Sequence, residues 1–272
     1  IEEEVVLRAY MDPFDSRPAS VENFLHRGVP TRYSYRQVKR YTNKFADRLG
    51  QGGFGTVYKG KLPNERLVAI KVFDKSKHCQ NQFMSEVATL GRIHHLHLVR
   101  LLGYCFEGSK RALVYEYMVN GSLEKYIHGD YHIKLDWRQL YSIAMGTARG
   151  IAYLHDECIS RILHCDIKPH NILLDANFSP KVADFGLAKL TDREETHVSL
   201  TGARGTPGYV APEVWSRNNG SVTDRSDVYI YGMLLMEMVG GRKNLDMKAT
   251  RSSRFFYSTG HSNKWKLMNL ER

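Results

Sequence analysis

Four polar residues that could carry out chemistry together lie near the middle of the chain. LHCDIKPHN supplies Asp166, Lys168 and Asn171, and ADFG supplies Asp184 a short distance further on. A single Asp or Asn in a loop is most often a turn former. As a set, these groups offer a carboxylate to accept a hydroxyl proton, an ammonium to neutralise a phosphate, and two oxygen ligands for Mg²⁺. The combination predicts phosphoryl transfer from a metal-bound nucleotide to a hydroxyl group.

A glycine-rich stretch, GQGGFGTV, provides a second candidate phosphate site through Gly50, Gly52 and Gly55. Glycine lets the backbone approach phosphates closely, and free backbone N–H groups can bind anions. The strand-like TVYKG that follows argues against a dinucleotide-binding turn, which must open a helix. A glycine-rich hairpin that binds no ligand is the alternative for this stretch taken alone.

A buried ion pair is expected between Lys71, at the end of the apolar strand VAIK, and Glu86 on the next helix. A buried lysine and a buried glutamate need each other, because an unpaired buried charge is costly. The pair could be purely structural. Its position after the glycine-rich stretch instead indicates a lysine that contacts a phosphate and is held there by the glutamate.

The elements that must position these residues fall into two groups, and the first is mostly sheet. From residue 31 to residue 118 the chain reads as short β-like runs broken by glycine. Apolar residues at helical spacing predict one helix over 31–45, reaching Phe45, and a longer one over 82–93.

The second group, residues 119–244, is mostly helical. It contains a long amphipathic helix over 136–157, a small β-rich patch, and an irregular segment over 187–224. Residues 228–239 are apolar on nearly all sides, which predicts a deeply buried helix.

We therefore predict an α+β fold of two lobes: a β-rich N-lobe with one main helix, and a larger C-lobe that is mostly helical. A small ligand is expected between them. Residues 1–30 are expected to be a largely irregular flank, and residues 245–272 a divergent basic tail.

Composition and charge exclude several other classes. The chain has 272 residues and 42% hydrophobic residues, enough for a sizeable core. Its net charge of +10 divides into −3 for residues 1–30, +7 for 31–240 and +6 for 241–272. A mildly basic body suits phosphate ligands as well as DNA, and no regular basic stripe with interleaved aromatics occurs, so a nucleic-acid partner is not expected.

The cysteine spacing, the apolar runs and the start of the chain indicate the environment of the protein. The four cysteines are widely spaced without a CxxC pair, which is typical of reduced cytosolic thiols. No run reaches the roughly 18 apolar residues of a membrane-spanning helix. Because the chain starts at Ile1 without a leader pattern, we expect an internal or processed fragment.

Taken in order, these motifs resemble the signature set of the protein kinases. The set comprises the glycine-rich stretch, VAIK, Glu86, HCDIKPHN, DFG and APE at 211–213, and it covers roughly residues 45–240. The resemblance implies that ATP and Mg²⁺, with Mn²⁺ as a substitute, are the cofactors, and that proteins, the kinase itself included, are the substrates.

The resemblance also implies a role for each site residue. Lys71, fixed by Glu86, would bind the α- and β-phosphates, and the three glycines would cover them. Asn171 and Asp184 would hold two Mg²⁺ ions. Asp166 would be the catalytic base, assisted by Lys168.

The adenine site and the hydrophobic spine follow by the same resemblance. Tyr115 would be the gatekeeper, and the backbone of Glu116 and of Met118 would meet adenine. The ring would lie between Val57, Ala69 and Leu173. The spine of an active kinase would consist of Leu90, Leu101, His164 and Phe185, anchored by Asp227.

The substrate class and the closer group are also implied by resemblance. Lys168 and Thr206 in GTPGYVAPE resemble serine/threonine kinases. RYSYRQVKRYTNKF and HCDIKPHNILLD resemble the plant receptor-like kinases of the leaf-rust-resistance-locus group. Such proteins carry an extracellular domain and one membrane span. In the parent protein, this chain is therefore expected on the cytoplasmic face of the plasma membrane, attached only through upstream segments. By itself the chain is expected to be soluble and cytoplasmic. A role in immune or developmental signalling would follow.

Three residues carry expectations about regulation. Cys165 stands where most family members have an arginine that receives an activation-loop phosphate, and an uncharged thiol cannot do this. Loop phosphorylation is therefore not expected to be required. Thr201 is the first choice for a phosphosite, whereas Thr206 is expected to contact Asp166 and Lys168.

The C-terminal part departs from the family pattern near Asn244, which predicts an incomplete C-lobe. No arginine could be identified to pair with Glu213, and the apolar helix would lose part of its cover. This supports an alternative function: a truncated, weakly active or inactive nucleotide-binding module that interacts with kinase partners.

Three histidines lie close together in the sequence: His94, His95 and His97. They are interpreted as a packed turn rather than a metal site.

Overall fold

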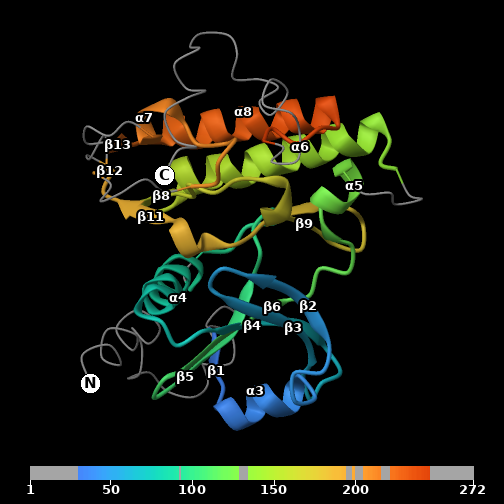
Figure 1. The fold of residues 1–272 in the computed structure, drawn as a ribbon, viewed down its shortest axis with the longest axis vertical. Helices are drawn as coiled ribbons and strands as arrows, with labels where there is room; N and C mark the ends of the chain where they lie inside the picture. The colour runs from blue at the N-terminus through green and yellow to red at the C-terminus, as the bar shows by residue number, and fades with distance from the viewer. Residues whose placement is uncertain are drawn as a thin grey trace, which may run out of the picture.

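A six-stranded sheet forms the smaller lobe, at the bottom of Figure 1. The computed structural model describes residues 30–91, 93–128, 134–193, 198–199, 205–215 and 221–245. Neighbouring strands of this sheet are antiparallel except for β1 and β5, which are parallel. The strand order is β1 (Thr31–Arg32), β5 (Leu101–Glu107), β6 (Lys110–Glu116), β4 (Leu67–Phe73), β3 (Gly55–Lys61) and β2 (Arg48–Gly52).

Two capped helices complete the N-lobe. Helix α3 (Tyr35–Tyr41) begins after Ser34, which forms a reciprocal capping box with Gln37, and α4 (Lys77–Leu90) begins after the cap Ser76. The prediction of a helix reaching Phe45 is wrong, because residues 43–45 adopt positive φ angles that end the helix. Helix α4 starts earlier than the predicted residue 82 and ends at Leu90, since Gly91 caps it.

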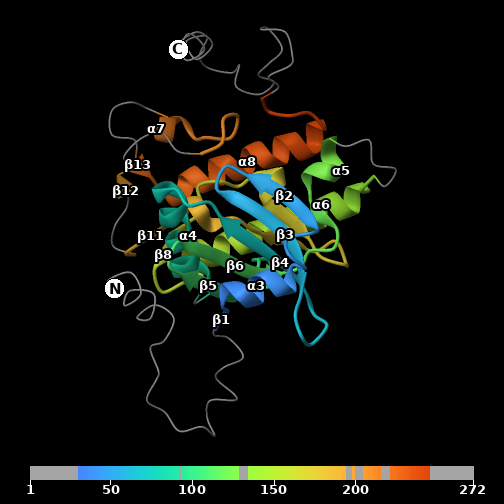
Figure 2. The same cartoon turned by 60° about the horizontal axis from the view of Figure 1, so that its bottom comes forward.

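The larger lobe contains the expected helices and several short strands. Helices α6 and α8 lie side by side in both Figure 1 and Figure 2, which differ by a rotation of 60°. The Tyr231 hydroxyl of α8 donates to the Ala144 carbonyl of α6 at 2.9 Å. The helices are α5 (Glu124–His128), α6 (Trp137–Ala152) with a π-helical turn (Tyr153–Glu157), α7 (Pro212–Trp215) and α8 (Asp224–Gly240).

The larger lobe also contains three small sheets of short strands. The segment over 187–224, expected to be irregular, in fact contributes three of these strands and helix α7. The strands are β7 (Gly121–Ser122), β9 (Ile172–Leu174) and β10 (Pro180–Val182) in one sheet, β8 (Arg161–Leu163) with β11 (Lys189–Thr191), and β12 (Val198–Ser199) with β13 (Ser221–Val222).

Helix α8 is only partly buried, so the prediction that residues 228–239 are deeply buried is wrong for one face. Ile230 and Leu234 are buried, whereas Val228 and Val239 are 60% and 67% exposed. The helix is capped at its start by Thr223 and at its end by Gly241, which has a positive φ of 59°.

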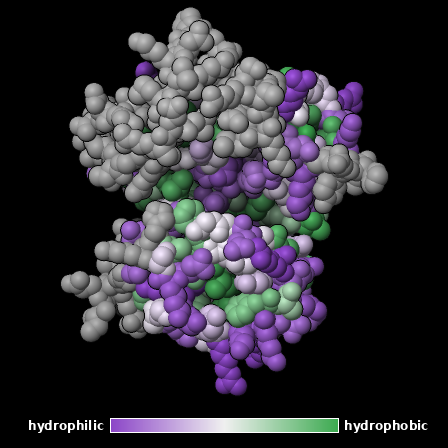
Figure 3. Space-filling model, viewed as in Figure 1, coloured by the Kyte–Doolittle hydropathy of each residue, from purple (hydrophilic) through white to green (hydrophobic). Residues whose placement is uncertain are grey.

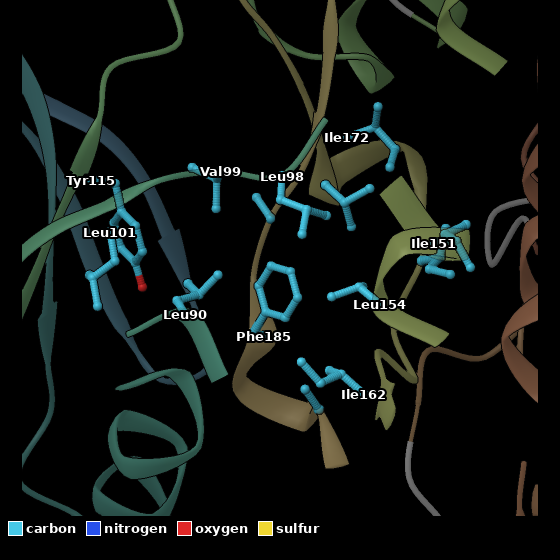
Figure 4. Close-up of a cluster of buried hydrophobic side chains, with 14 of the residues drawn as sticks. Leu90, Leu98, Val99, Leu101, Tyr115, Ile151, Leu154, Ile162, Ile172 and Phe185 are labelled. Atoms are coloured by element: carbon cyan, nitrogen blue, oxygen red, sulfur yellow. The ribbon is translucent and has the colours of Figure 1, made fainter. Parts of the chain in front are cut away.

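One hydrophobic core crosses from lobe to lobe. Figure 4 shows Phe185 between Leu90 on the N-lobe side and Leu154 and Ile162 on the C-lobe side. Phe185 is fully buried, so the segment that carries Asp184 is fixed by packing against both lobes. Among the described residues, no helix has the length and hydrophobicity that a bilayer span requires.

Candidate active site

Asp166 lies at the centre of a network of three side chains. Lys168 Nζ donates to Asp166 Oδ2 at 2.8 Å, and Thr206 Oγ1 donates to Asp166 Oδ1 at 2.5 Å. Lys168 Nζ also donates to Thr206 Oγ1 at 2.8 Å. The contacts expected for Thr206 are therefore present, and they tie the loop before APE directly to the candidate base.

Asn171 fixes Asp166 from the other side. Its Nδ2 donates to the Asp166 carbonyl at 2.8 Å and to Asp166 Oδ2 at 3.0 Å. Because a carboxylate only accepts hydrogen bonds, the amide nitrogen must face Asp166 and the amide oxygen must point away from it. That oxygen is the atom that a hard cation would bind.

Asp227 of α8 holds the loop that carries Asp166. This carboxylate is fully buried and accepts from the His164 N–H at 2.7 Å, the Cys165 N–H at 2.8 Å and His155 Nε2 at 2.9 Å. Cys165 has a φ of 64°, a left-handed backbone that needs such external support. A carboxylate from the central helix therefore sets the path of the loop.

The Cys165 side chain is packed rather than open to solvent. It is 9% exposed and lies in a small apolar cluster with Leu163, Ala211, Val214 and Val222. Its thiol donates to the Leu163 carbonyl at 3.7 Å. Cys165 is therefore a small residue packed in the interior of the C-lobe.

His164 connects the loop to the DFG segment through a defined tautomer. Its Nδ1 accepts from the Asp166 N–H at 3.2 Å, and its Nε2 lies 3.2 Å from the Ala183 carbonyl. Because Nδ1 accepts, the proton must be on Nε2. The ring also packs edge-on against Phe185, with centroids 4.8 Å apart, as expected for two members of the spine.

Lys71 pairs with two carboxylates from different elements. Its Nζ lies 2.5 Å from Glu86 Oε1 on α4 and 2.9 Å from Asp184 Oδ1. Burial by itself would lower the pKa of Lys71, but the two carboxylates outweigh burial and raise this pKa, so the ammonium stays charged. Burial would raise the pKa of Asp184, and the ion pair with Lys71 outweighs that effect and lowers it. Both groups are therefore ionised at neutral pH.

Tyr115 makes a contact that the sequence did not indicate. Its hydroxyl donates to Glu86 Oε2, and both side chains are buried. Burial and the neighbouring Glu86 charge raise the pKa of Tyr115 well above its usual value, so the hydroxyl keeps its proton and remains a donor. Glu86 is therefore held on both oxygens, by Lys71 and by Tyr115.

The three glycines of the β2–β3 hairpin differ in what the fold requires. Gly55 has a φ of 150°, and a Cβ there would lie 2.1 Å from the Val72 carbonyl oxygen, so only glycine fits. At Gly50 and Gly52 a Cβ would meet nothing within 4 Å. The fold does not explain glycine at these two positions, whereas close approach of a ligand would.

The expected adenine site draws its walls from both lobes. Val57 on β3, Ala69 on β4 and Leu173 on β9 are all half-buried. Among the described backbone hydrogen bonds, Met118 takes part only through its carbonyl, which accepts from Gly121. Its N–H is thus available as a donor to a ring edge.

The neighbouring Glu116 is fixed by other contacts. Its N–H donates to the Arg100 carbonyl at 3.2 Å, and its carboxylate accepts from the Arg100 N–H at 2.9 Å. These contacts tie Glu116, at the end of β6, to the residue that precedes β5.

A small pocket opens beside Asp166 on the side facing α8. Thr206, Tyr209 and Val210 contribute to its lining together with Asp166. Tyr209 is held by a hydrogen bond from its hydroxyl to Glu237. Its volume is about 10 Å³, which is room for about one water molecule and not for a substrate segment.

Other candidates are placed as follows. His97 is buried, with Nδ1 3.0 Å from the Pro180 carbonyl, and His95 stacks on Tyr153 at 4.7 Å, so the histidines form a packed turn. Thr201 lies outside the described residues. Glu213 accepts from Ser226 Oγ at 2.9 Å.

Sequence reasoning missed one further anchor, Arg193. Its guanidinium donates to the Asp156 carbonyl at 2.5 Å and to the Cys158 carbonyl at 2.8 Å, at the end of the helix that follows α6. Carbonyls at the C-terminal end of a helix generally lack partners within it, and a cation suits that end. No local pattern could have revealed this contact, because it joins segments 35 or more residues apart.

Comparisons with known proteins agree with this geometry. The family described as "Protein kinase domain" matches residues 44–264, which is most of the chain. The matched range begins near the expected residue 45 and extends past the expected residue 240. The chain therefore belongs to the protein kinase family, in its serine/threonine class.

Its relatives define the closer group as the plant receptor-like kinases. Rust resistance kinase Lr10 of Triticum aestivum is 56% identical over 80% of this chain and 35% of its own length. A leaf rust 10 disease-resistance locus receptor-like protein kinase-like protein (2.4) of Arabidopsis thaliana is 51% identical over 88% of this chain and 39% of its own length. A G-type lectin S-receptor-like serine/threonine-protein kinase of Arabidopsis thaliana is 55% identical over 84% of this chain and 26% of its own length. The chain thus spans about a quarter to two fifths of the length of these relatives.

Proposed function

We propose that this domain transfers the γ-phosphoryl group of Mg²⁺-bound ATP to serine or threonine hydroxyls of proteins. The observation that carries this proposal is the Asp166 network, in which a carboxylate, an ammonium and an amide converge within hydrogen-bond distance. A protein kinase domain uses ATP and a divalent metal in general. The choice of Mg²⁺ is part of the proposal, with Mn²⁺ as a substitute.

The proposed chemistry at the transfer end is proton acceptance and charge neutralisation. Asp166 would orient the substrate hydroxyl and accept its proton, and Lys168 would neutralise charge on the transferred phosphoryl group. Asn171 and Asp184 would hold Mg²⁺, which supplies further neutralisation of the phosphates when bound. Two protein oxygen ligands suit this ion, because Mg²⁺ usually completes its shell with phosphates and water.

The proposed nucleotide site lies on the N-lobe side of the same network. Lys71, held by Glu86, would contact the α- and β-phosphates, and Gly50, Gly52 and Gly55 would let the hairpin approach them. The Glu116 carbonyl and the Met118 N–H would meet the adenine edge.

We also propose that the parent protein signals at the plasma membrane. The support is that the relatives are receptor-like kinases in which the matching part is a minor share of the chain. Immune or developmental signalling is the corresponding biological role, and the physiological substrate is a plant protein that carries serine or threonine.

Regulation in this proposal does not depend on loop phosphorylation. Cys165 offers no positive charge to a phosphate, and Arg193 already anchors the start of the loop through backbone carbonyls. Thr201 remains the first candidate for a modulatory phosphosite, and Thr206 acts through its contacts to Asp166 and Lys168.

The experiment is phosphate transfer from Mg²⁺-ATP to a generic protein substrate, followed by phosphoamino-acid analysis. Asp166→Asn should lower transfer by about 10²–10⁴-fold, since it removes the proton acceptor. Asp175→Asn is the matched control, because the Asp175 side chain caps the β9–β10 turn by accepting from the N–H groups of Asn177 and Ser179, which an asparagine oxygen can also do. Wild-type transfer by Asp166→Asn, or phosphotyrosine as the main product, would refute the proposal.

A second candidate function is a weakly active nucleotide-binding module that associates with kinase partners. The exposed apolar side chains of α8, among them Val228, Met236 and Val239, favour it. The same assay separates the two: a module of this kind binds Mg²⁺-ATP and transfers little or no phosphate.

A further inference from the structure

The positive charge of the folded domain is concentrated in one short stretch. Residues 31–66 carry nine bases and two acids, a net charge of +7. Residues 67–240 carry nineteen bases and nineteen acids, a net charge of zero. The excess charge of the domain therefore belongs to α3 and to the first strands that follow it.

Helix α3 directs its bases away from the fold. Val38 and Tyr41 are buried against the sheet, in a small core of their own. Arg36, Lys39 and Arg40 are exposed, and their spacing of three and four residues puts them on one face. Lys44 follows in the exposed turn after the helix. Arg36, Lys39, Arg40 and Lys44 are called the α3 face below.

Within the described part of the chain, the α3 face is not neutralised. Arg36, Lys39 and Lys44 have no carboxylate at ion-pair distance there. Arg40 lies over the Tyr41 ring at 5.1 Å and contacts its hydroxyl.

The two acids of the same stretch do not change this. Glu65 is used by Lys61 in an ion pair. Asp47 is exposed, and its single negative charge cannot neutralise the four positive charges of the α3 face. Like charges held together without a partner repel one another, which an external anionic surface would relieve.

The position of α3 leaves the active site free. In Figure 1 the helix lies at the opposite end of the described fold from α6 and α8, on the far side of the sheet from β8 and β9, between which Asp166 lies in the sequence. Figure 3 shows hydrophilic side chains protruding along this lower edge of the small lobe. A surface that contacted the α3 face would not cover the junction between the lobes.

We propose that the α3 face binds the surface of an anionic lipid bilayer. The bases protrude from a convex helix rather than lining a groove, so they suit a broad, fluid layer of negative charge better than one bound molecule. The chain enters the described fold at residue 30, directly before α3. The inference rests on the proposed receptor-like placement, in which any membrane-attached upstream segment would hold this end of the domain nearest the bilayer.

The strength expected is moderate and dependent on salt. Each basic residue near an anionic leaflet raises the binding affinity by about fivefold, so four such residues raise it on the order of several hundredfold. The Debye length falls from about 10 Å at 0.1 M salt to about 3 Å at 1 M, so high salt should release the protein. Residues 1–30, with a net charge of −3, weaken this attraction without cancelling it.

The test is co-sedimentation of the full 272-residue chain with vesicles of phosphatidylcholine, with and without phosphatidylserine. Binding is expected only with phosphatidylserine and only at low salt. The variant Arg36→Gln, Lys39→Gln, Arg40→Gln and Lys44→Gln should bind at least about 100-fold more weakly. Its melting temperature and its activity on a soluble substrate should match the wild type.

A charge-matched control separates this face from net charge. The control variant replaces four exposed bases of the larger lobe by glutamine: Lys125, Lys134, Arg138 and Arg149. It should retain most of the vesicle binding, and soluble glycerophosphoserine should not compete.

Several results would overturn the proposal. They are equal losses in the two variants, equal binding to vesicles without phosphatidylserine, and no vesicle binding at low salt. Binding of polyglutamate but not of vesicles through the α3 face would assign an acidic protein partner instead. All of these are independent of the phosphate-transfer assay, so failure here and failure of the kinase proposal can be told apart.

Discussion

Tyr115→Phe is the substitution that tests the structure most sharply, because the Tyr115–Glu86 contact was not expected from the sequence. Phenylalanine keeps the ring and its packing and removes only the hydroxyl. Glu86 Oε2 would then lose its donor in a site where the Glu86 residue is 1% exposed, too closed for water to replace it freely. A hydrogen bond to a charged group contributes about 1.5–3 kcal/mol. For a domain of this size, that corresponds to a fall in melting temperature of about 3–12 °C.

The assay is denaturant unfolding in a double-mutant cycle with Glu86→Gln. In the Glu86→Gln background the tyrosine faces a neutral amide, so Tyr115→Phe should cost only about 0.5–1.5 kcal/mol. The difference between the two backgrounds measures the coupling. Because Glu86 also holds Lys71, Tyr115→Phe should in addition raise the KM for ATP.

Tyr231→Phe is the matched control for this cycle. Its hydroxyl donates to a neutral carbonyl, that of Ala144, in the other lobe. It should cost about 0.5–1.5 kcal/mol and show no coupling to Glu86→Gln. The reasoning is refuted if Tyr115→Phe costs no more than Tyr231→Phe and costs the same in both backgrounds.

Four further outcomes follow from the same contacts. Thr206→Val should lower kcat/KM by about 10–100-fold with little change in melting temperature, and Thr206→Ser should restore activity, since the hydroxyl bonds to charged groups. Asp227→Leu should lower the free energy of unfolding by about 3–5 kcal/mol in denaturant titrations, because three buried donors lose their acceptor. Because the pKa of Asp184 is lowered in the folded state, its contribution to stability is present above its unfolded pKa and is lost as pH falls through its folded pKa. In Lys71→Met the ammonium is gone, so burial raises the pKa of Asp184. The acid limb of the pH profile of Mg²⁺-ATP binding should therefore move to higher pH. Alanine at every hydroxyl residue over 191–201 should leave most transfer activity, and a fall to background would show that a loop phosphate is needed after all.

Local pattern was sufficient for much of the fold and for the residues gathered around Asp166. Alternation and helical spacing indicated the β-rich N-lobe and the main helices, since one face of each is buried. The catalytic stretch lies on one short loop, so spacing along the chain is close to spacing in space.

The remaining features depend on contacts between distant segments. Tyr115 and Glu86 meet across 29 residues, and neither position by itself signals the other. The end of α3 before Phe45 is set by three consecutive positive φ angles. Asn43 favours this conformation, but Lys44 and Phe45 do not, so the sequence announces only the first of the three. The exposure of Val228 and Val239 depends on what packs over α8 and not on the composition of the helix.

Single-turnover transfer of the γ-phosphoryl group from Mg²⁺-ATP tests the central claim most directly. The wild type and Asp166→Asn would be compared on a serine- and threonine-containing protein, with ATP affinity measured on the same samples. The account predicts that the wild type transfers phosphate and that Asp166→Asn transfers it about 10²–10⁴-fold more slowly, with ATP affinity nearly unchanged. Transfer by Asp166→Asn at the wild-type rate, or no transfer by a wild type that binds Mg²⁺-ATP, would contradict it.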